Sequence, residues 1–128
     1  MNDSNKYQEG QIWQYNTREG EENSLVYIVK IDNEERYGSI YHVYADNLSI
    51  TNPYVKSGIQ SELFHAPVDE ETLTQSLIKL VKENSSPMPD ISDGYSTWKK
   101  AFDKGEAGVF NISIKKIIQI IEDASNQR

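Results

Sequence analysis

Residues 24–32 read SLVYIVKID, and this stretch decides the fold. One face of an extended chain here would carry alternate apolar side chains, at Leu25, Tyr27, Val29 and Ile31. Val26 and Ile28 make the opposite face apolar as well. A strand that is apolar on both faces is usually central in a sheet or covered on both sides. We therefore expect this stretch to be an inner strand of a covered sheet.

Strand-like segments surround this stretch on both sides. They are residues 12–15, 37–45, 48–50 and 59–66. A polar turn over residues 33–36 leads into the aromatic and β-branched segment 37–45. Asp46-Asn47 suits a tight hairpin into residues 48–50 because asparagine tolerates positive φ, and Asn52-Pro53 ends that strand. The first half therefore predicts an antiparallel meander of about five strands.

The second half changes to a helical period. Asp69 is a suitable N-cap, and apolar residues then recur at helical spacing, at Leu73, Leu77, Leu80 and Val81. This predicts a helix from residue 70 to residue 82. We also expect a short helix over residues 95–102 before Gly105, a final strand over 109–112, and a helix from 114 to 121 capped by Ser113. The predicted class is α+β, with two to three helices packed on the meander.

Composition limits the domain count, the compartment and the partners. A chain of 128 residues predicts one domain over 1–128, with residues 1–9 as a flexible N-terminal tail. The chain has 20 acidic and 13 basic residues and a net charge of −7, which argues against nucleic acid as a partner. No stretch approaches the about 20 apolar residues of a membrane span, and the first residues lack a secretory apolar core. These features predict a cytoplasmic protein without membrane contact.

Known catalytic and cofactor motifs are missing from the sequence. The absence of cysteine excludes disulfides, thiolate metal sites and thiol nucleophiles. The sequence contains no HExxH, no G-x-S-x-G and no glycine-rich nucleotide loop. We therefore expect no cofactor, no metal and no assigned catalytic residue. His42 and His65 lie in strand-like apolar segments, where a histidine satisfied by the backbone is the more common case.

The loop of residues 16–23 concentrates charge beside the first strand. Arg18 is one of three arginines in the chain and stands among three glutamates. Its planar guanidinium could hold a carboxylate or phosphate through two hydrogen bonds. We name as candidate partner-binding residues Tyr15, Thr17, Arg18, Glu19, Glu21 and Glu22. The alternative is a solvated hairpin loop with weak surface ion pairs.

Several short motifs resemble those of a known group of proteins. They are Gly10-x-x-Trp13-x-Tyr15-x-Thr17-Arg18-x-x-Glu21-x-x-Ser24, Leu48-x-Ile50-x-Asn52-Pro53, His65-x-Pro67, Gly94-Tyr95-x-x-Trp98-x-x-Ala101-Phe102 and Ala107-Gly108-Val109-Phe110. The pattern is similar to that of a family of small soluble proteobacterial proteins with no established activity. It runs from about residue 10 to residue 122, so it implies a single domain. This chain departs from the family by having Asp46-Asn47 where a glycine is expected.

Three hypotheses of function follow from these observations. The first is an acidic binding protein, in its sharpest form an immunity or antitoxin-like protein that covers the active site of a basic toxin. The second is a small-molecule-binding or hydrolytic domain with Arg18, Glu21, His42 and His65 in one pocket. The third is a subunit of a larger complex, or a homodimer, that associates through the C-terminal helix of residues 113–124. The first is favoured because no catalytic motif is present.

Overall fold

The computed structural model describes residues 6–127, whose main element is an antiparallel sheet of five strands. In spatial order these strands are β6 (Leu63–Val68), β3 (Gly38–Ala45), β2 (Leu25–Glu34), β1 (Gln11–Tyr15) and β7 (Leu77–Lys82). β2 is the central strand, which confirms the expectation from its two apolar faces. Residues 1–5 of the expected tail lie outside the described residues. Tyr7, in the rest of that tail, is buried and its ring contacts Trp13 and Tyr41.

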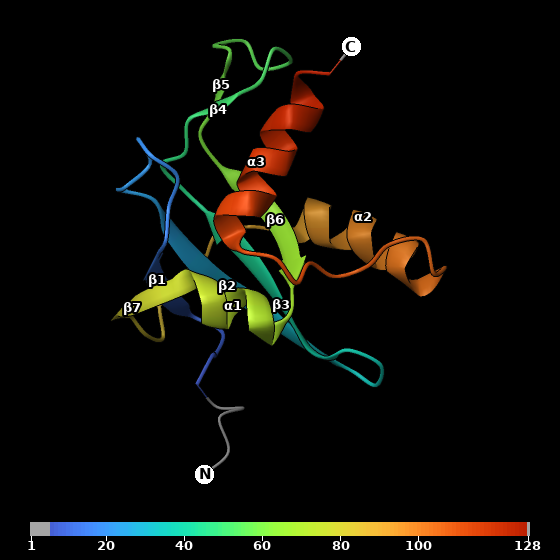
Figure 1. Cartoon of the computed structure of the whole chain (residues 1–128). Coiled ribbons are helices and arrows are strands. Elements are labelled where there is room, and N and C mark those ends of the chain that lie inside the picture. The colour runs from blue at the N-terminus through green and yellow to red at the C-terminus, as the bar shows by residue number, and fades with distance from the viewer. Residues whose placement is uncertain (1–5, 128) are drawn as a thin grey trace.

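A second, two-stranded sheet is formed by β4 (Ile50–Thr51) and β5 (Ile59–Gln60). Figure 1 shows this hairpin beside the C-terminal end of the last helix, away from the main sheet. The turn before it carries Asn47 with φ of 49°, a left-handed conformation that asparagine tolerates. The hairpin predicted at this turn is not formed, because β3 pairs with β2 and β6 and β4 pairs with β5. The segment predicted as one strand over 59–66 is therefore divided between the hairpin and the main sheet.

Three helices cover the main sheet: α1 (Glu70–Ser76), α2 (Ser92–Asp103) and α3 (Ile114–Ser125). Asp69 caps α1 by accepting a hydrogen bond from the Thr72 amide, and Ser113 caps α3 through the Lys116 amide. Gly105 ends α2 with φ of 76°, a left-handed conformation that costs glycine little. These three ends are those that the sequence predicts.

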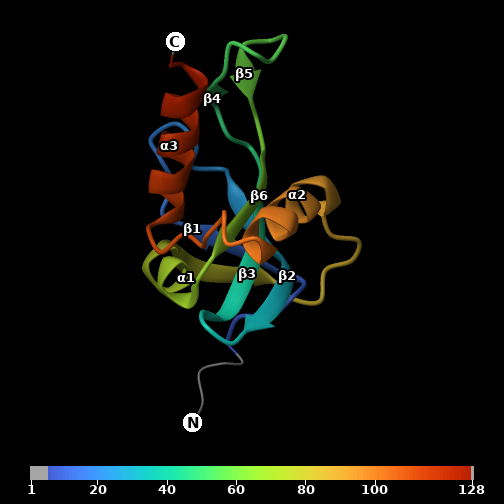
Figure 2. The same cartoon turned by 90° about the vertical axis from the view of Figure 1, so that its right-hand side faces the viewer.

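The helices lie on both faces of the sheet (Figure 2). α1 and α3 cover one face and complete the main core, in which their contributions are Leu73, Ile114, Ile117 and Ile118. The strands contribute to the same core Trp13, Tyr15, Val26, Ile28, Tyr41, Val43 and Ala45. α2 covers the other face, where Trp98 contacts the His42 ring. The α+β class, with an antiparallel sheet followed by packed helices, is thus confirmed.

The prediction of one helix over residues 70–82 is correct in its first half and wrong in its second half. The helix ends at Ser76, and residues 77–82 form β7 along the open edge of β1. Leu77 pairs with Tyr15 and Leu80 with Trp13, and the pairing shifts register between these two positions. Because the strand bulges there, two leucines three residues apart reach the same face of the sheet. The spacing that resembles a helical stripe is therefore satisfied by a bulged strand.

The final strand predicted over residues 109–112 is also not formed. Only one bridge occurs there, a parallel contact between Phe110 and Val68. Thr72 of α1 occupies this segment's carbonyl groups instead, by donating its hydroxyl to Phe110 and Ile112. Among the described residues, no helix is both long enough and apolar enough to cross a membrane.

Candidate functional site

The structure gives Arg18 and Glu21 an internal role. Arg18 donates from Nε to Glu21 Oε1 at 2.9 Å and from Nη2 to Glu21 Oε2 at 2.7 Å. The Glu21 side chain is 1% exposed, and its Oε2 also accepts the Ser49 amide at 2.8 Å. A buried carboxylate needs such partners, since an unpaired charge in the interior is costly. The pair therefore fixes the loop between β1 and β2 against the segment that enters β4.

Arg18 also connects this loop to α3. Its Nη1 donates to Glu122 Oε1 at 2.9 Å and to Gln119 Oε1 at 3.0 Å. Glu122 in turn accepts the Thr51 amide, and this hydrogen bond lowers the pKa of Glu122. The hydrogen bonds to Glu21 and Glu122 raise the pKa of Arg18. Since Nε, Nη1 and Nη2 all donate within the chain, Arg18 is not presented to a partner's carboxylate.

The other predicted partner-binding residues divide into buried and exposed. Tyr15 is buried, its hydroxyl lies 2.8 Å from Ser24 Oγ, and burial raises its pKa to about 12. Thr17 is half-buried. Glu19 and Glu22 are exposed, and Glu22 accepts the Gly20 amide, which lowers the pKa of Glu22. Of the six predicted residues, only these two glutamates are exposed.

A more accessible surface lies where the hairpin meets α3, the helix to which Arg18 joins the loop that carries these glutamates. Tyr54 is 82% exposed and Ile59 is 46% exposed, both on the hairpin. Asn126 donates to the Thr51 carbonyl oxygen and so holds the end of α3 against β4. Asp123 of α3 is exposed, and Lys56 adds one cation in the hairpin turn. We call this surface the docking end, defined by Glu19, Glu22, Tyr54, Ile59 and Asp123.

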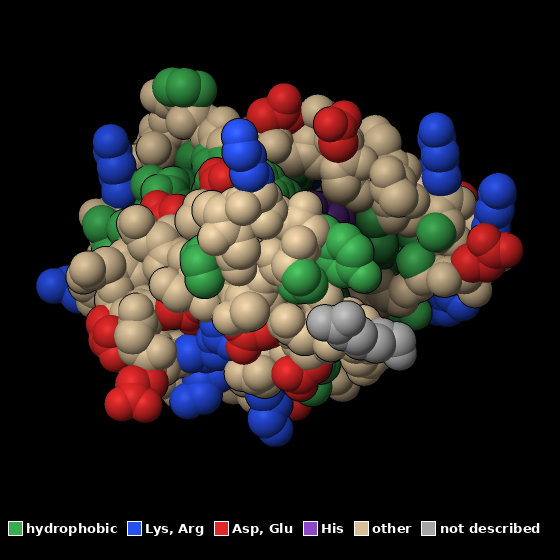
Figure 3. Space-filling model, turned by 90° about the horizontal axis from the view of Figure 1, so that it is seen from above, with side chains coloured by type: hydrophobic (Ala, Val, Ile, Leu, Met, Phe, Trp, Pro, Cys, Tyr) green, Lys and Arg blue, Asp and Glu red, His purple; other side chains and the backbone are tan. Residues whose placement is uncertain are grey.

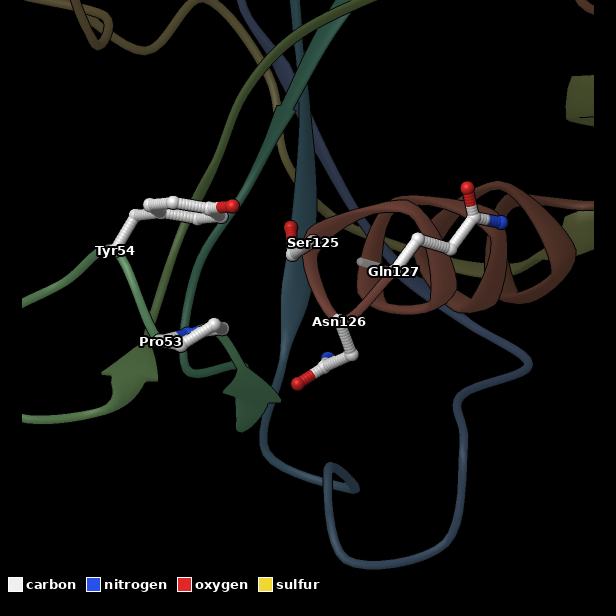
Figure 4. A pocket seen from close by; sticks show the side chains of 5 residues that line it. All are labelled: Pro53, Tyr54, Ser125, Asn126 and Gln127. Atoms are coloured by element: carbon white, nitrogen blue, oxygen red, sulfur yellow. The ribbon is translucent and has the colours of Figure 1, made fainter.

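A depression of about 270 Å³ lies within the docking end. Figure 4 shows Pro53 and Tyr54 of the hairpin on one side of it and Ser125, Asn126 and Gln127 on the other. Figure 3 looks onto this end, where hydrophobic, acidic and basic side chains are intermixed and a histidine is visible in a hollow. The depression combines an aromatic wall with amide and hydroxyl groups, a lining that suits protein side chains.

The two histidines come together on the other face of the sheet. His42 is fully buried, and its Nδ1 lies 2.9 Å from Nε2 of His65. Its Nε2 lies 3.1 Å from Asp32 Oδ2, an oxygen that also accepts the Tyr95 hydroxyl at 2.7 Å. The rings of Tyr95 and Trp98 meet the His42 ring edge to face, with centroids 4.8 and 4.9 Å away. We call Asp32, His42, His65, Tyr95 and Trp98 the histidine cluster.

Burial and neighbouring charges set the ionisation of this cluster. Burial lowers the pKa of His42 despite the opposing effect of Asp32. Burial and the adjacent His42 lower the pKa of His65 to about 4. For Asp32, burial works against ionisation, but the Tyr95 hydroxyl, His42 and Lys30 outweigh it and lower the pKa. At pH 7 the cluster therefore contains one carboxylate and two neutral imidazoles.

Arg18 and Glu21 do not join the histidines in one pocket. Tyr41 and Val43 belong to the core under α3, and the side chain of His42 between them contacts α2. Successive side chains of a strand point to opposite faces, so the histidine cluster lies on the α2 face. Arg18 is bound to α3 on the other face. The four-residue pocket of the second hypothesis is therefore replaced by two separate groups.

Sequence reasoning missed Asp32 and Tyr95 as site residues. Asp32 pairs with Ile40 across the predicted turn, and His42 lies two residues after Ile40 on the same strand. The alternation of side chains could therefore have placed Asp32 and His42 on one face of the sheet. Tyr95 lies 63 residues from Asp32 and gives no local signal. Within residues 6–127, no group of three or more histidine or acidic side chains could hold a metal ion.

Comparison of the chain with models of protein families, with curated proteins and with solved structures finds no match.

Proposed function

We propose that this chain is a small acidic binding protein of the cytoplasm that docks on a basic protein through the docking end. The observation that carries the proposal is Tyr54, which is 82% exposed at the edge of a depression. Exposed tyrosines of this kind supply a large part of the binding energy in many interfaces, because the ring buries apolar area while the hydroxyl forms a hydrogen bond.

Charge supports the choice of partner. The chain has a net charge of −7, and Glu19, Glu22 and Asp123 add exposed carboxylates around the apolar centre of the docking end. Acidic groups around an apolar anchor attract a basic surface over distance and fix its orientation. The sharpest form of the proposal is an immunity or antitoxin-like protein that covers the basic active site of a toxin such as a nuclease.

The internal role of Arg18 also supports the proposal. Because Arg18 is neutralised by Glu21 and Glu122, it offers little repulsion to an approaching cation. It also holds the loop with Glu19 and Glu22 firmly beside α3. A pre-organised loop loses little conformational entropy when it binds.

The test begins with capture of a partner from the cells that make the protein, followed by titration of the two purified proteins. Tyr54→Ala is expected to weaken binding by about 30-fold, and Glu19→Lys/Glu22→Lys by about 10-fold or more at low salt. The matched control is Glu83→Lys/Glu106→Lys, which changes the charge equally at exposed positions outside the docking end. Affinity should also fall as salt rises.

Two outcomes would contradict the proposal. One is an equal loss of affinity in the control variant, which would show that net charge alone matters. The other is a Tyr54→Ala protein that binds like the wild type. If the partner is a nuclease, an equimolar amount of the wild-type chain should abolish its hydrolysis of nucleic acid.

Homodimerisation through residues 113–124 is a separate proposal that one observation favours. Ile120 is 49% exposed on α3, whereas Ile114, Ile117 and Ile118 are buried in the chain's own core. A dimer through this helix would double the mass in light scattering, and Ile120→Lys would return it to the monomer value. A monomer mass in the wild type at high concentration would exclude it.

A further inference from the structure

The depression at the docking end lies against the C-terminal end of α3. The backbone carbonyl groups at such an end carry a partial negative charge, which basic side chains in the last turn offset. Residues 122–125 form the last turn of α3 and include no basic residue. Arg18 reaches this turn, but it is shared between Glu122 and a second carboxylate, and Asp123 adds a further exposed carboxylate. Lys56 of the hairpin does not line the depression, which is therefore bordered by a locally negative helix end.

Two side chains on the helix side of the depression already use their hydrogen-bond donors within the chain. Asn126 Nδ2 has two hydrogens and donates to the Thr51 carbonyl oxygen at 2.8 Å and to the Glu122 carbonyl oxygen at 2.7 Å. Both of these neighbours are acceptors, so they fix the orientation of the amide and leave Asn126 Oδ1 as an acceptor. The Ser125 hydroxyl donates to the Ile121 carbonyl oxygen at 2.9 Å, so the Ser125 oxygen can also only accept. A ligand held by these two side chains must therefore donate hydrogen bonds.

The hairpin side of the depression supplies an open aromatic ring. Figure 4 shows the Tyr54 side chain extended toward the end of α3, and this residue is 82% exposed. Its backbone amide donates to Asn52 Oδ1 at 2.9 Å, which holds the turn in place without covering the ring. An aromatic ring attracts a cation placed over its face. The chain already contains one such contact, because the guanidinium of Arg36 lies 5.5 Å from the ring centroid of Tyr37.

We propose that the depression between Tyr54 and the end of α3 binds an arginine side chain of the basic partner. A guanidinium is planar and always charged, and it carries five N–H donors and no acceptor. It can therefore stack on the Tyr54 ring while it donates to Asn126 Oδ1 and Ser125 Oγ. A lysine ammonium supplies the charge but not the flat surface for stacking. The identity of the partner rests on the proposed function, whereas binding of a guanidinium by the isolated chain does not.

The first test is an NMR titration of the isotope-labelled wild-type chain with N-acetyl-arginine amide at low salt. The matched probe is N-acetyl-citrulline amide, which has nearly the same shape but no charge. We expect the arginine probe to shift the amide signals of Tyr54 and Asn126 and to bind about 5-fold or more tightly than the citrulline probe. Equal affinity for the two probes, or an arginine probe that shifts no signal of the docking end, would overturn the proposal.

The second test separates stacking from simple contact area. Tyr54→Phe keeps the aromatic face, so its affinity for the arginine probe should stay within about 2-fold of the wild type, whereas Tyr54→Leu should bind about 3–5-fold more weakly. Both variants change an exposed side chain, so the fold is expected to persist. The matched control is Tyr37→Leu, which removes another exposed tyrosine outside the docking end and should bind like the wild type. If Tyr54→Leu binds the probe as tightly as Tyr54→Phe, the stacking contact is wrong.

The chain's own Arg128 is the alternative occupant that the test must address. This arginine follows Gln127 in the sequence and lies outside the described residues. The titration is therefore repeated with Arg128→Gln, whose affinity for the arginine probe should lie within about 3-fold of the wild type. A gain of more than about 10-fold would show that Arg128 competes for the site, and it would overturn the assignment to a partner's arginine.

The last test uses the purified partner in a double-mutant cycle. Each arginine of the partner's binding surface is changed to alanine and measured against wild-type Tyr54 and Tyr54→Leu. One arginine should be coupled to Tyr54 by about 3-fold or more, and the others should act independently. A partner whose arginines all act independently of Tyr54 would overturn this inference and leave the docking proposal intact. A Tyr54→Ala protein that binds the partner like the wild type would contradict both, even where the free arginine probe still binds.

Discussion

Replacing Arg18 by methionine tests the role that the structure gives it. The substitution removes both hydrogen bonds to Glu21, at 2.9 and 2.7 Å, and leaves a carboxylate that is 1% exposed with the Ser49 amide as its remaining partner. Loss of one member of a fully buried ion pair costs about 3–5 kcal/mol. Because the Arg18 side chain is 15% exposed, water can reach part of the gap. We expect a loss of about 2–4 kcal/mol.

The assay is urea unfolding followed by tryptophan fluorescence, to which Trp13 in the core and Trp98 of α2 both contribute. Arg18→Met/Glu21→Gln should be more stable than Arg18→Met by about 1 kcal/mol or more, because the uncompensated charge is gone. The control is Lys99→Met, which breaks an exposed pair with Asp103 at 2.7 Å and should leave stability unchanged. If Arg18→Met is as stable as Lys99→Met, the internal role of Arg18 is refuted.

Three further predictions concern the other parts of the fold. Folding lowers the pKa of His65 from 6.5 to about 4, so the unfolded chain binds a proton on this ring more readily than the folded chain does. Stability should therefore be full above pH 6.5 and fall by about 1–2 kcal/mol as the pH approaches 4, after allowance for solvent screening. As the pH is lowered, the urea midpoint should fall less steeply in His65→Gln than in the wild type. Equal pH slopes in the two proteins would contradict this prediction. Gly94→Ala gains helix propensity but places a carbon 2.7 Å from His65 Cβ, so we expect a net loss of about 1–2 kcal/mol in the same assay. A more stable Gly94→Ala protein would disprove the close contact. Asp69→Ala removes the cap of the Thr72 amide and should cost about 1 kcal/mol, whereas Asp69→Asn should cost less.

The sequence predicted correctly the strand and the helix ends that are determined by residues close to them along the chain. Alternation of apolar residues placed β2 at the centre of the sheet, and Asp69, Ser113 and Gly105 marked helix ends where backbone groups need partners. The error at β7 arose because an apolar spacing of three or four residues fits both a helix and a bulged strand. The vacant edge of β1, which decided between them, is a property of the tertiary structure.

The candidate sites depended on contacts between distant residues. Arg18 meets Gln119 and Glu122 of α3 about a hundred positions along the chain, so its sequence surroundings indicated a surface loop. His42 and His65 are joined by the pairing of β3 with β6, which aligns His42 with Pro67. Their apolar neighbours correctly indicated strands, but His42 is fully buried and bonds to the side chains of Asp32 and His65 rather than to the backbone. Nothing local identified Asp32 and Tyr95 as partners.

The most direct test of the binding proposal is an NMR titration of the isotope-labelled chain with its purified partner. We predict that the amide signals that shift most belong to the docking end, at Glu19, Glu22, Tyr54, Ile59 and Asp123. Signals of the exposed edge strand β7, such as Ile78, should stay in place. Shifts centred on β7 or on α2, with the docking end unchanged, would contradict the account.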